Sequence, residues 1–259
     1  MLKKEKFPIL EFDSESRPIV NASAYNEKVA QRRVVTRCVI TYFSDIVEKL
    51  ERNQHINQVF RLRMEGYRPR VYEMQNGNEW VYVIAAPVGA PQAARIMECM
   101  GAMGVTRFMI CGGAGTLNDA VTKEHVLVAV AAVRDEGTSY HYLPPSREVQ
   151  INKIALSSIE KTLKAEGVHH IPVKTWTTDA IFRETEDKVE LRKSENCVTV
   201  EMECSAYYAV GQHKGYTVGQ LLYAADSVSK DGWDYRDWHT RTEKRTLLFN
   251  LAMKCVMNF

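Results

Sequence analysis

The sequence predicts a single α/β domain with a central twisted mixed β-sheet flanked by helices. Short β-branched apolar runs alternate with amphipathic segments of helical length, the pattern of helices layered on a largely buried sheet. The length of 259 residues fits one large domain, and neither a repeat nor a Gly/Ser-rich linker divides it. Hydrophobic residues at 45% and charged residues at 25% are ordinary globular values, which excludes disordered and fibrous classes.

Apolar runs and amphipathic periodicity locate the individual elements. Runs dominated by β-branched and aromatic residues predict strands at 37–42, 70–74, 80–85, 107–111, 125–133, 173–177, 197–200 and 217–224. Apolar residues at three- and four-residue spacing predict helices at 91–100, 152–165, 202–213 and 240–257. Residues 1–30 are polar and irregular, so we expect an N-terminal arm that packs over the domain, 31–259, or onto a neighbouring subunit.

Charge and cysteine usage exclude several function classes. The 34 Lys and Arg residues against 32 Asp and Glu give a net charge of only +2, so no nucleic-acid partner is expected. The longest apolar stretches are far shorter than the ~20 residues of a membrane span, and no apolar segment of signal-peptide length follows the charged start. The six cysteines lack metal-ligand spacing and are expected as reduced core thiols. We therefore expect a cytoplasmic protein with no membrane partner and no bound metal.

Three glycines directly after a predicted strand form the first candidate ligand segment. Gly112, Gly113 and Gly115 follow the strand at 107–111, and ligands of α/β folds gather where strands end. Glycines let a ligand approach main-chain N–H groups closely, although a tight turn without a ligand explains them equally well. The spacing is neither G-x-G-x-x-G nor a Walker loop, so dinucleotide and ATP binding are not predicted.

Acidic residues follow two other predicted strands. Glu201, Met202 and Glu203 stand at a strand-to-helix junction, where a partly buried carboxylate needs donors such as paired sugar hydroxyls. The alternative is a favourable interaction with the helix dipole. Asp226 follows the last predicted strand, and a carboxylic acid there protonates a leaving group if burial raises its pKa. A turn or N-cap role is the alternative for Asp226.

Two aromatic-rich segments complete the candidates. Residues 134–142 follow a predicted strand, and Trp233, Tyr235 and Trp238 follow Asp226. The second group indicates a lid or a base-stacking wall, with simple packing of an irregular loop as the alternative.

In this order, the segments resemble the nucleoside phosphorylase family that includes uridine phosphorylase, hexameric bacterial purine nucleoside phosphorylase and methylthioadenosine nucleosidase. The resemblance runs from about Val81 to the C-terminal helix. Its most specific match is Glu201-Met202-Glu203, similar to the family's ribose motif, which implies that Glu203 binds the 2′- and 3′-hydroxyls and Met202 packs on the sugar. Residues 86–91 resemble the family's glycine-proline loop, and 111–115 its glycine turn at the phosphate.

The resemblance also implies residues for the base. Residues 177–182 resemble the base-site segment, so Trp176 or Phe182 is expected to contact the nucleobase. The uracil-reading Gln and Arg of uridine phosphorylases are not matched after Phe182, where Arg183 and Glu184 are the candidates to act on a base edge. Asp226 has the position of the acid that protonates N7 in purine-acting members, whereas 135–142 resembles the uridine phosphorylase branch. Base preference therefore stays open between purines and pyrimidines.

The phosphate residues of the family are not matched. Family phosphorylases carry a Gly-Asp-Pro loop with an Arg after the first strand, where this chain reads Tyr42-Phe43-Ser44-Asp45. Ile110 and Gly113 stand where the family has an Arg and a Ser or Thr. Either other basic residues hold the phosphate, the nearest in the early strands being Arg37, Arg68 and Arg70, or water is the acceptor.

The resemblance implies phosphorolysis of a nucleoside to free base and sugar 1-phosphate, with inorganic phosphate as co-substrate and no metal or organic cofactor. It also implies a homo-oligomer, dimer or hexamer, with sites near subunit interfaces. A nucleosidase using water, with Asp45 or Glu201 as base, is one alternative. A non-catalytic nucleoside-binding protein is another, but the presence of both Glu203 and Asp226 argues against it.

Overall fold

The computed structural model describes residues 2–14, 17–26, 33–121, 125–230 and 232–259. Its strands form one mixed sheet: β1 (Arg37–Thr41), β2 (Asn57–Arg61), β3 (Arg70–Asn76), β4 (Glu79–Ala85), β5 (Arg107–Thr116), β6 (Val126–Asp135), β7 (Glu148–Gln150), β8 (His170–Thr178), β9 (Cys197–Glu201), β10 (Thr217–Lys230) and β11 (Gly232–Asp234). The α-helices are α1 (Ala22–Asn26), α2 (Ser44–Arg52), α3 (Ala90–Gly101), α4 (Lys153–Ala165), α5 (Glu186–Ser194), α6 (Cys204–Lys214) and α7 (Thr242–Met257). Short 3-10 turns are η1 (Pro8–Leu10), η2 (Ser139–His141), η3 (Ile181–Arg183) and η4 (Trp238–Thr240).

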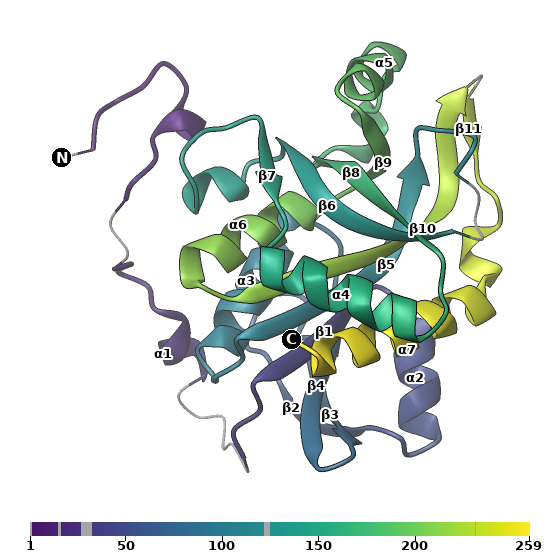
Figure 1. The fold of residues 1–259 in the computed structure, drawn as a ribbon. Coiled ribbons are helices and arrows are strands. Elements are labelled where there is room, and N and C mark those ends of the chain that lie inside the picture. The colour runs from purple at the N-terminus through teal and green to yellow at the C-terminus, as the bar shows by residue number, and fades with distance from the viewer. Residues whose placement is uncertain (1, 15–16, 27–32, 122–124, 231) are drawn as a thin grey trace.

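Part of the sheet closes on itself. β5 pairs with β10, and the ring continues through β6, β8 and β9 back to β5. From β5 the sheet extends through β1 and β4 to the β3–β2 edge (Figure 1). The predicted α/β domain with a mixed sheet is confirmed.

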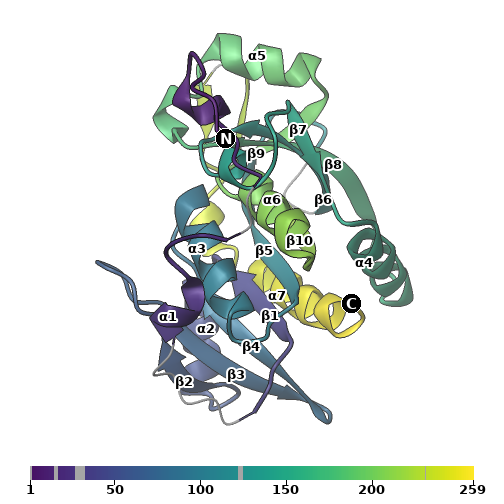
Figure 2. The same ribbon diagram turned by 90° about the vertical axis from the view of Figure 1, so that its left-hand side faces the viewer.

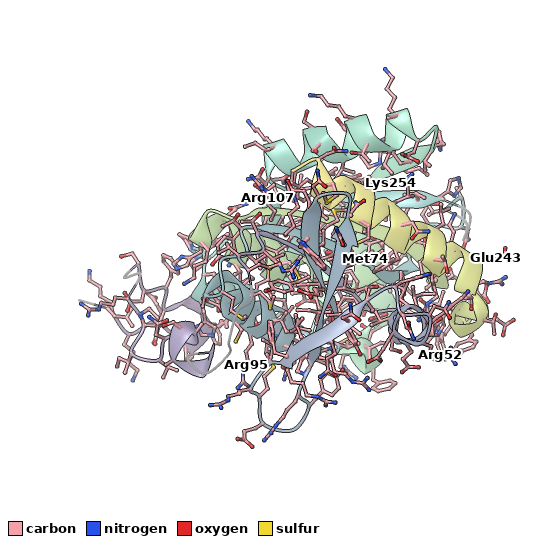
Figure 3. All side chains as sticks on the ribbon, turned by 90° about the horizontal axis from the view of Figure 1, so that it is seen from below. Arg52, Met74, Arg95, Arg107, Glu243 and Lys254 are labelled. Atoms are coloured by element: carbon pink, nitrogen blue, oxygen red, sulfur yellow. The ribbon has the colours of Figure 1, made fainter. Side chains whose placement is uncertain are left out.

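Helices cover both faces of the sheet. On β10, Val218 packs against Gly211 of α6, whereas its neighbour Gly219 packs against Ile159 of α4, and successive strand residues point to opposite faces. α3 and α6 therefore share one face, and α4 and α7 the other (Figure 2). Seen from below, α7 runs beside α4, with Glu243 near its start and Lys254 near its end (Figure 3). Lys254 is ion-paired with Glu166 at the end of α4.

The predicted strands and helices are all present, but two strands run further than predicted. β5 continues from 111 to Thr116 and β10 from 224 to Lys230. The predicted turn at Gly112, Gly113 and Gly115 is therefore wrong, because these glycines lie inside β5 and none has a positive φ. α2, α5 and β2 were not predicted, α5 because charged residues surround most of its circumference.

The core and the N-terminal segment complete the fold. All six cysteines are free and buried in the sheet and helices. In the N-terminal segment, η1 packs against η2, with Ile9 close to Gly137, and α1 packs against α3. The predicted boundary between residues 30 and 31 lies outside the described residues. Among the described residues, no helix is long and apolar enough to cross a membrane.

Candidate active site

The predicted site residues from four strands meet at one end of the ring. Glu201 ends β9 opposite Thr177 of β8, and the next residue back, Val200, is paired with Gly115 of β5. Gly115 is in turn paired with Asp226 of β10. Two strand spacings, roughly 10 Å, therefore separate the backbones at Val200 and Asp226, with Gly115 of β5 between them.

Glu203 is the acidic residue with unused hydrogen-bonding capacity at the junction. It occupies the N-cap position of α6 and is 5% exposed. Its Oε1 accepts a 2.6 Å hydrogen bond from the backbone N–H of Gly89, in the predicted glycine-proline loop. A carboxylate accepts about four hydrogen bonds, so Glu203 retains acceptor capacity for a ligand hydroxyl. Met202, between the two acids, is partly exposed.

Glu201 serves the backbone of the junction instead. Its Oε2 accepts bonds from the N–H groups of Glu203 at 2.9 Å and Cys204 at 2.6 Å, and its Oε1 from Thr177 Oγ1 at 2.6 Å. Burial raises the pKa of Glu201 above the ordinary value, while these hydrogen bonds oppose the rise. Burial also raises the pKa of Glu203, and the nearby charge of Glu201 adds to the rise. One carboxyl therefore shapes the loop, and the other faces the site.

Tyr42 occupies the place of the missing glycine loop. Its hydroxyl lies 2.9 Å from that of Tyr207 on α6 and hydrogen-bonds Glu203, which favours the charged form of that carboxyl. Its ring packs on β5, where a Cβ at Gly112 would lie 3.1 Å from Tyr42 Cδ2. Gly113 is equally constrained, since a Cβ there would lie 2.9 Å from the Cβ of Ala225. Close packing of strands accounts for these two glycines.

Asp226 lies at a register shift in β10, opposite Gly115. The indole N–H of Trp233 donates to Asp226 Oδ2 at 2.6 Å, whereas Oδ1 lies 3.5 Å from an ideal Cβ position on Gly115. Burial raises the pKa of Asp226, and the Trp233 hydrogen bond opposes the rise. Burial and the charge of Asp226 raise the pKa of Glu184 to about 7, so two acids share this part of the site.

The predicted base contacts lie in different environments. Trp176 is 0% exposed, and its indole N–H donates to Asp135 Oδ2 at 3.0 Å inside a second apolar cluster. Phe182 is 95% exposed on η3, next to the exposed Arg183. η3 is tied to the predicted 134–142 segment, because the N–H of Gly137 donates to Asp179 Oδ2 at 2.9 Å. Phe182, rather than Trp176, is therefore open to a ligand.

A buried arginine near the β1–α2 loop was missed by sequence reasoning. Arg245 Nη2 of α7 lies 2.6 Å from Asp45 Oδ1 in a close ion pair without hydrogen-bond alignment, and its guanidinium stacks on Phe43. The charges of Arg245, Asp45 and Asp226 all influence the pKa of the Tyr223 hydroxyl, which burial raises to about 12. Only the spacing of Arg245 on the amphipathic last helix could have indicated its inward direction.

Of the basic residues expected from the early strands, Arg37 and Arg70 are engaged in ion pairs. Arg37 begins β1, at the opposite end from Tyr42, and pairs with Glu79 at 2.5 Å. Arg70 pairs with Glu51 at 2.9 Å, and Arg68 is exposed. Across the described residues, no group of three or more His, Cys, Asp or Glu side chains is arranged to hold a metal ion. None of these three arginines is therefore shown at the site, whose named residues are mainly acidic and aromatic.

Comparisons with known proteins agree on one family. A family model for the phosphorylase superfamily matches residues 36–251. Guanosine phosphorylase of Halorubrum lacusprofundi is 26% identical over 141 residues, 54% of this chain and 58% of that protein. Uridine phosphorylase of Haemophilus influenzae is 22% identical over 160 residues, 55% of this chain and 64% of that protein. Each of these two alignments spans less than two thirds of the relative's length.

Solved structures show the same fold. Uridine phosphorylase from Vibrio fischeri superposes with a TM-score of 0.72 at 20% identity, covering 89% of this chain and 95% of that one. AMP nucleosidase from Bacteroides thetaiotaomicron gives 0.71 at 20% identity, covering 91% and 96%. Both a phosphorylase and a nucleosidase therefore share this architecture. Because the family model covers well over half of the sequence, the chain belongs to the phosphorylase superfamily, a superfamily of nucleoside-cleaving enzymes.

Proposed function

We propose that the protein is a nucleoside phosphorylase that cleaves the N-glycosidic bond of a purine nucleoside, releasing the free base and a sugar 1-phosphate. The observation that carries the bond cleavage is the pair of unlike acids at one end of the ring, Glu203 beside a backbone donor and Asp226 beside Gly115. The related guanosine phosphorylase supports a purine.

Each acid has a distinct task in the proposed reaction. As the C1′–N9 bond breaks, the sugar becomes oxocarbenium-like and its electron pair passes to the base. Glu203, hydrogen-bonded to the 2′- and 3′-hydroxyls, orients and polarises the sugar, with Met202 against its face. Asp226 gives its proton to N7, so that the base leaves neutral. Burial raises the pKa of Asp226 and so favours the protonated form that this step needs.

Arg245, which lies beside Asp45 at the start of α2, is the residue that we assign to the phosphate. A phosphate dianion in a partly closed site needs a cation or several backbone donors. The amino end of α2 has no side-chain cap, so its first N–H groups and the positive end of its dipole supplement Arg245. Phosphate would have to displace Asp45 from the ion pair, and its oxygen would then form the new bond to C1′.

A water acceptor is the second candidate, and the Asp45–Arg245 pair is also the observation that favours it. If Asp45 stays paired, Arg245 is neutralised and phosphate has no free cation among the described residues near β1. Asp45 is then the base that takes a proton from the attacking water. The fold shared with AMP nucleosidase is compatible with this route.

A nucleoside panel with and without phosphate tests both candidates. Free base is measured by chromatography, and the sugar product is identified as ribose 1-phosphate or ribose. If the reaction is phosphorolysis, cleavage requires phosphate, and the Arg245→Met variant loses this phosphate-dependent cleavage. Equal rates without phosphate, with free ribose as product and inactivity of Asp45→Asn, would establish hydrolysis. Cleavage of no nucleoside under either condition would overturn the proposed function.

A further inference from the structure

Trp233 is an exposed tryptophan that hydrogen-bonds a half-buried acid. Its ring is 63% exposed on β11, yet its indole N–H makes a 2.6 Å hydrogen bond to Asp226 Oδ2. β11 pairs with β10, with Asp234 opposite Ser227, so the hairpin holds Trp233 beside the acid. An edge-on contact with Tyr235 at 5.2 Å between ring centroids supports the ring from the other side. Leaving so large an apolar surface in water for one hydrogen bond indicates a role at the site.

The two oxygens of Asp226 have different surroundings. Oδ2 accepts the hydrogen bond from Trp233, while Oδ1 is the oxygen nearer to the Cβ position of Gly115, at 3.5 Å against 3.7 Å for Oδ2. Because Oδ2 already accepts from Trp233, the proton for a leaving base is assigned to Oδ1. After proton transfer from Oδ1, the carboxylate charge spreads to Oδ2, and a hydrogen bond to a charged acceptor is stronger than one to a neutral acid. The Trp233 bond therefore strengthens as the proton leaves.

We propose that Trp233 is a positioning residue for the proposed cleavage: its indole N–H orients Asp226 and stabilises the carboxylate left behind when the proton passes to a purine leaving group. This inference rests on the proposed function of Asp226. In the balanced step, the proton moves from Asp226 Oδ1 to N7, the C1′–N9 electron pair moves onto the base, and the acceptor bonds to C1′. Asp226 regains a proton from the acceptor through solvent.

Several other titratable groups surround the same acid. Arg236 and Asp234 act on it from the hairpin side, and its own charge acts on Glu184, which precedes α5, and on the Tyr223 hydroxyl of β10. Lys188 of α5 acts in turn on Glu184. Among the causes that favour the charged form of Asp226, the Trp233 hydrogen bond is the largest. Removing only the indole N–H is therefore the most direct perturbation.

The Trp233→Phe variant tests the inference, because it keeps an aromatic ring and removes the donor. We expect kcat with inosine to fall by roughly 3- to 10-fold, as for one charge-assisted hydrogen bond at a partly exposed site. The pKa of Asp226 rises without its donor, so the basic limb of the kcat/KM profile moves to higher pH. Trp80→Phe, on β4 at the far side of the sheet, is the matched control and leaves both unchanged.

A substrate that needs no proton separates this role from a structural one. An N7-methylated purine nucleoside carries a cationic base that departs without protonation, so Trp233→Phe should leave its cleavage within about 2-fold of wild type. Equal slowing of inosine and the methylated substrate, or an unmoved pH limb, would overturn the inference. Carbon-13 NMR of the Asp226 carboxyl gives the same pKa comparison without activity. An unchanged pKa in Trp233→Phe refutes the inference even if no purine nucleoside is cleaved.

Discussion

The two halves of the proposed site are built differently. On the ribose side, Glu203 is 5% exposed and fixed by the backbone of Gly89 and by Tyr42. On the base side, Phe182 is 95% exposed and Trp233 stands in solvent beside Asp226. A hydrogen-bonded, buried half is complete before a ligand arrives, whereas an open half gains much of its order from the ligand. Substitutions on the ribose side should therefore slow the cleavage of all nucleosides alike, whereas substitutions on the base side should have effects that depend on the base of the substrate.

Asp226→Asn gives the largest expected effect and tests the base side directly. Asparagine keeps the shape and the acceptor for Trp233 but cannot transfer a proton, so kcat for inosine should fall by about 10²-fold or more. Uridine has no N7, so its cleavage should change far less. Steady-state kinetics on both nucleosides decide the outcome. Equal slowing of the two would mean that Asp226 is structural.

Glu203→Ala should weaken catalysis for every nucleoside alike. Loss of the charged partner of the ribose hydroxyls should lower kcat/KM by about 10²-fold, or about 3 kcal/mol of transition-state stabilisation. The ratio of inosine to uridine cleavage should stay constant, because the base side is untouched. Wild-type kinetics in a folded Glu203→Ala protein would contradict the assignment. Circular dichroism provides the folding control.

Glu201→Ala should affect stability more than substrate binding. Glu201 satisfies two buried backbone N–H groups and the Thr177 hydroxyl, and leaving buried donors unsatisfied costs about 2–3 kcal/mol of unfolding free energy. Urea denaturation measures the loss. Thr177→Val removes one of these bonds and should cost about 1 kcal/mol. A Glu201→Ala protein as stable as wild type would show that the junction does not depend on this carboxyl.

The pH dependence of stability should identify the ribose side as the more buried half. Burial raises the folded-state pKa of Glu201 and Glu203 above the ordinary 4.5. Between pH 4.5 and neutrality the folded state therefore binds more protons than the unfolded state. Their contribution to stability is therefore full below pH 4.5 and is lost as pH rises through their raised folded-state pKa values. Glu203→Gln should make the decline shallower. Parallel urea midpoints for variant and wild type across that range would refute the assignment.

Sequence patterns located the strands and the junction well, and side-chain directions poorly. Apolar runs report burial, so the strands around Glu201 and Asp226 could be predicted. The glycines of β5 were misinterpreted, because close strand packing and ligand approach both require a missing Cβ. Arg245 was missed because its partner Asp45 is two hundred residues away in the sequence, and such pairs arise only from tertiary structure. The burial of Trp176 in an apolar cluster likewise arises from tertiary packing and could not be predicted from its neighbours in the sequence.

The six buried thiols can be used to measure local opening of the protein. Cysteine reacts as a thiolate, and burial raises the pKa of Cys197 to about 11 and of Cys111 to about 12. A thiol reagent therefore modifies each site only during the moments when that part of the chain separates. Cys197 reports on β9 directly before Glu201, whereas Cys111 reports on the centre of β5. Mass spectrometry of the labelled peptides over time thus gives a map of motion around the ribose side without any engineered label.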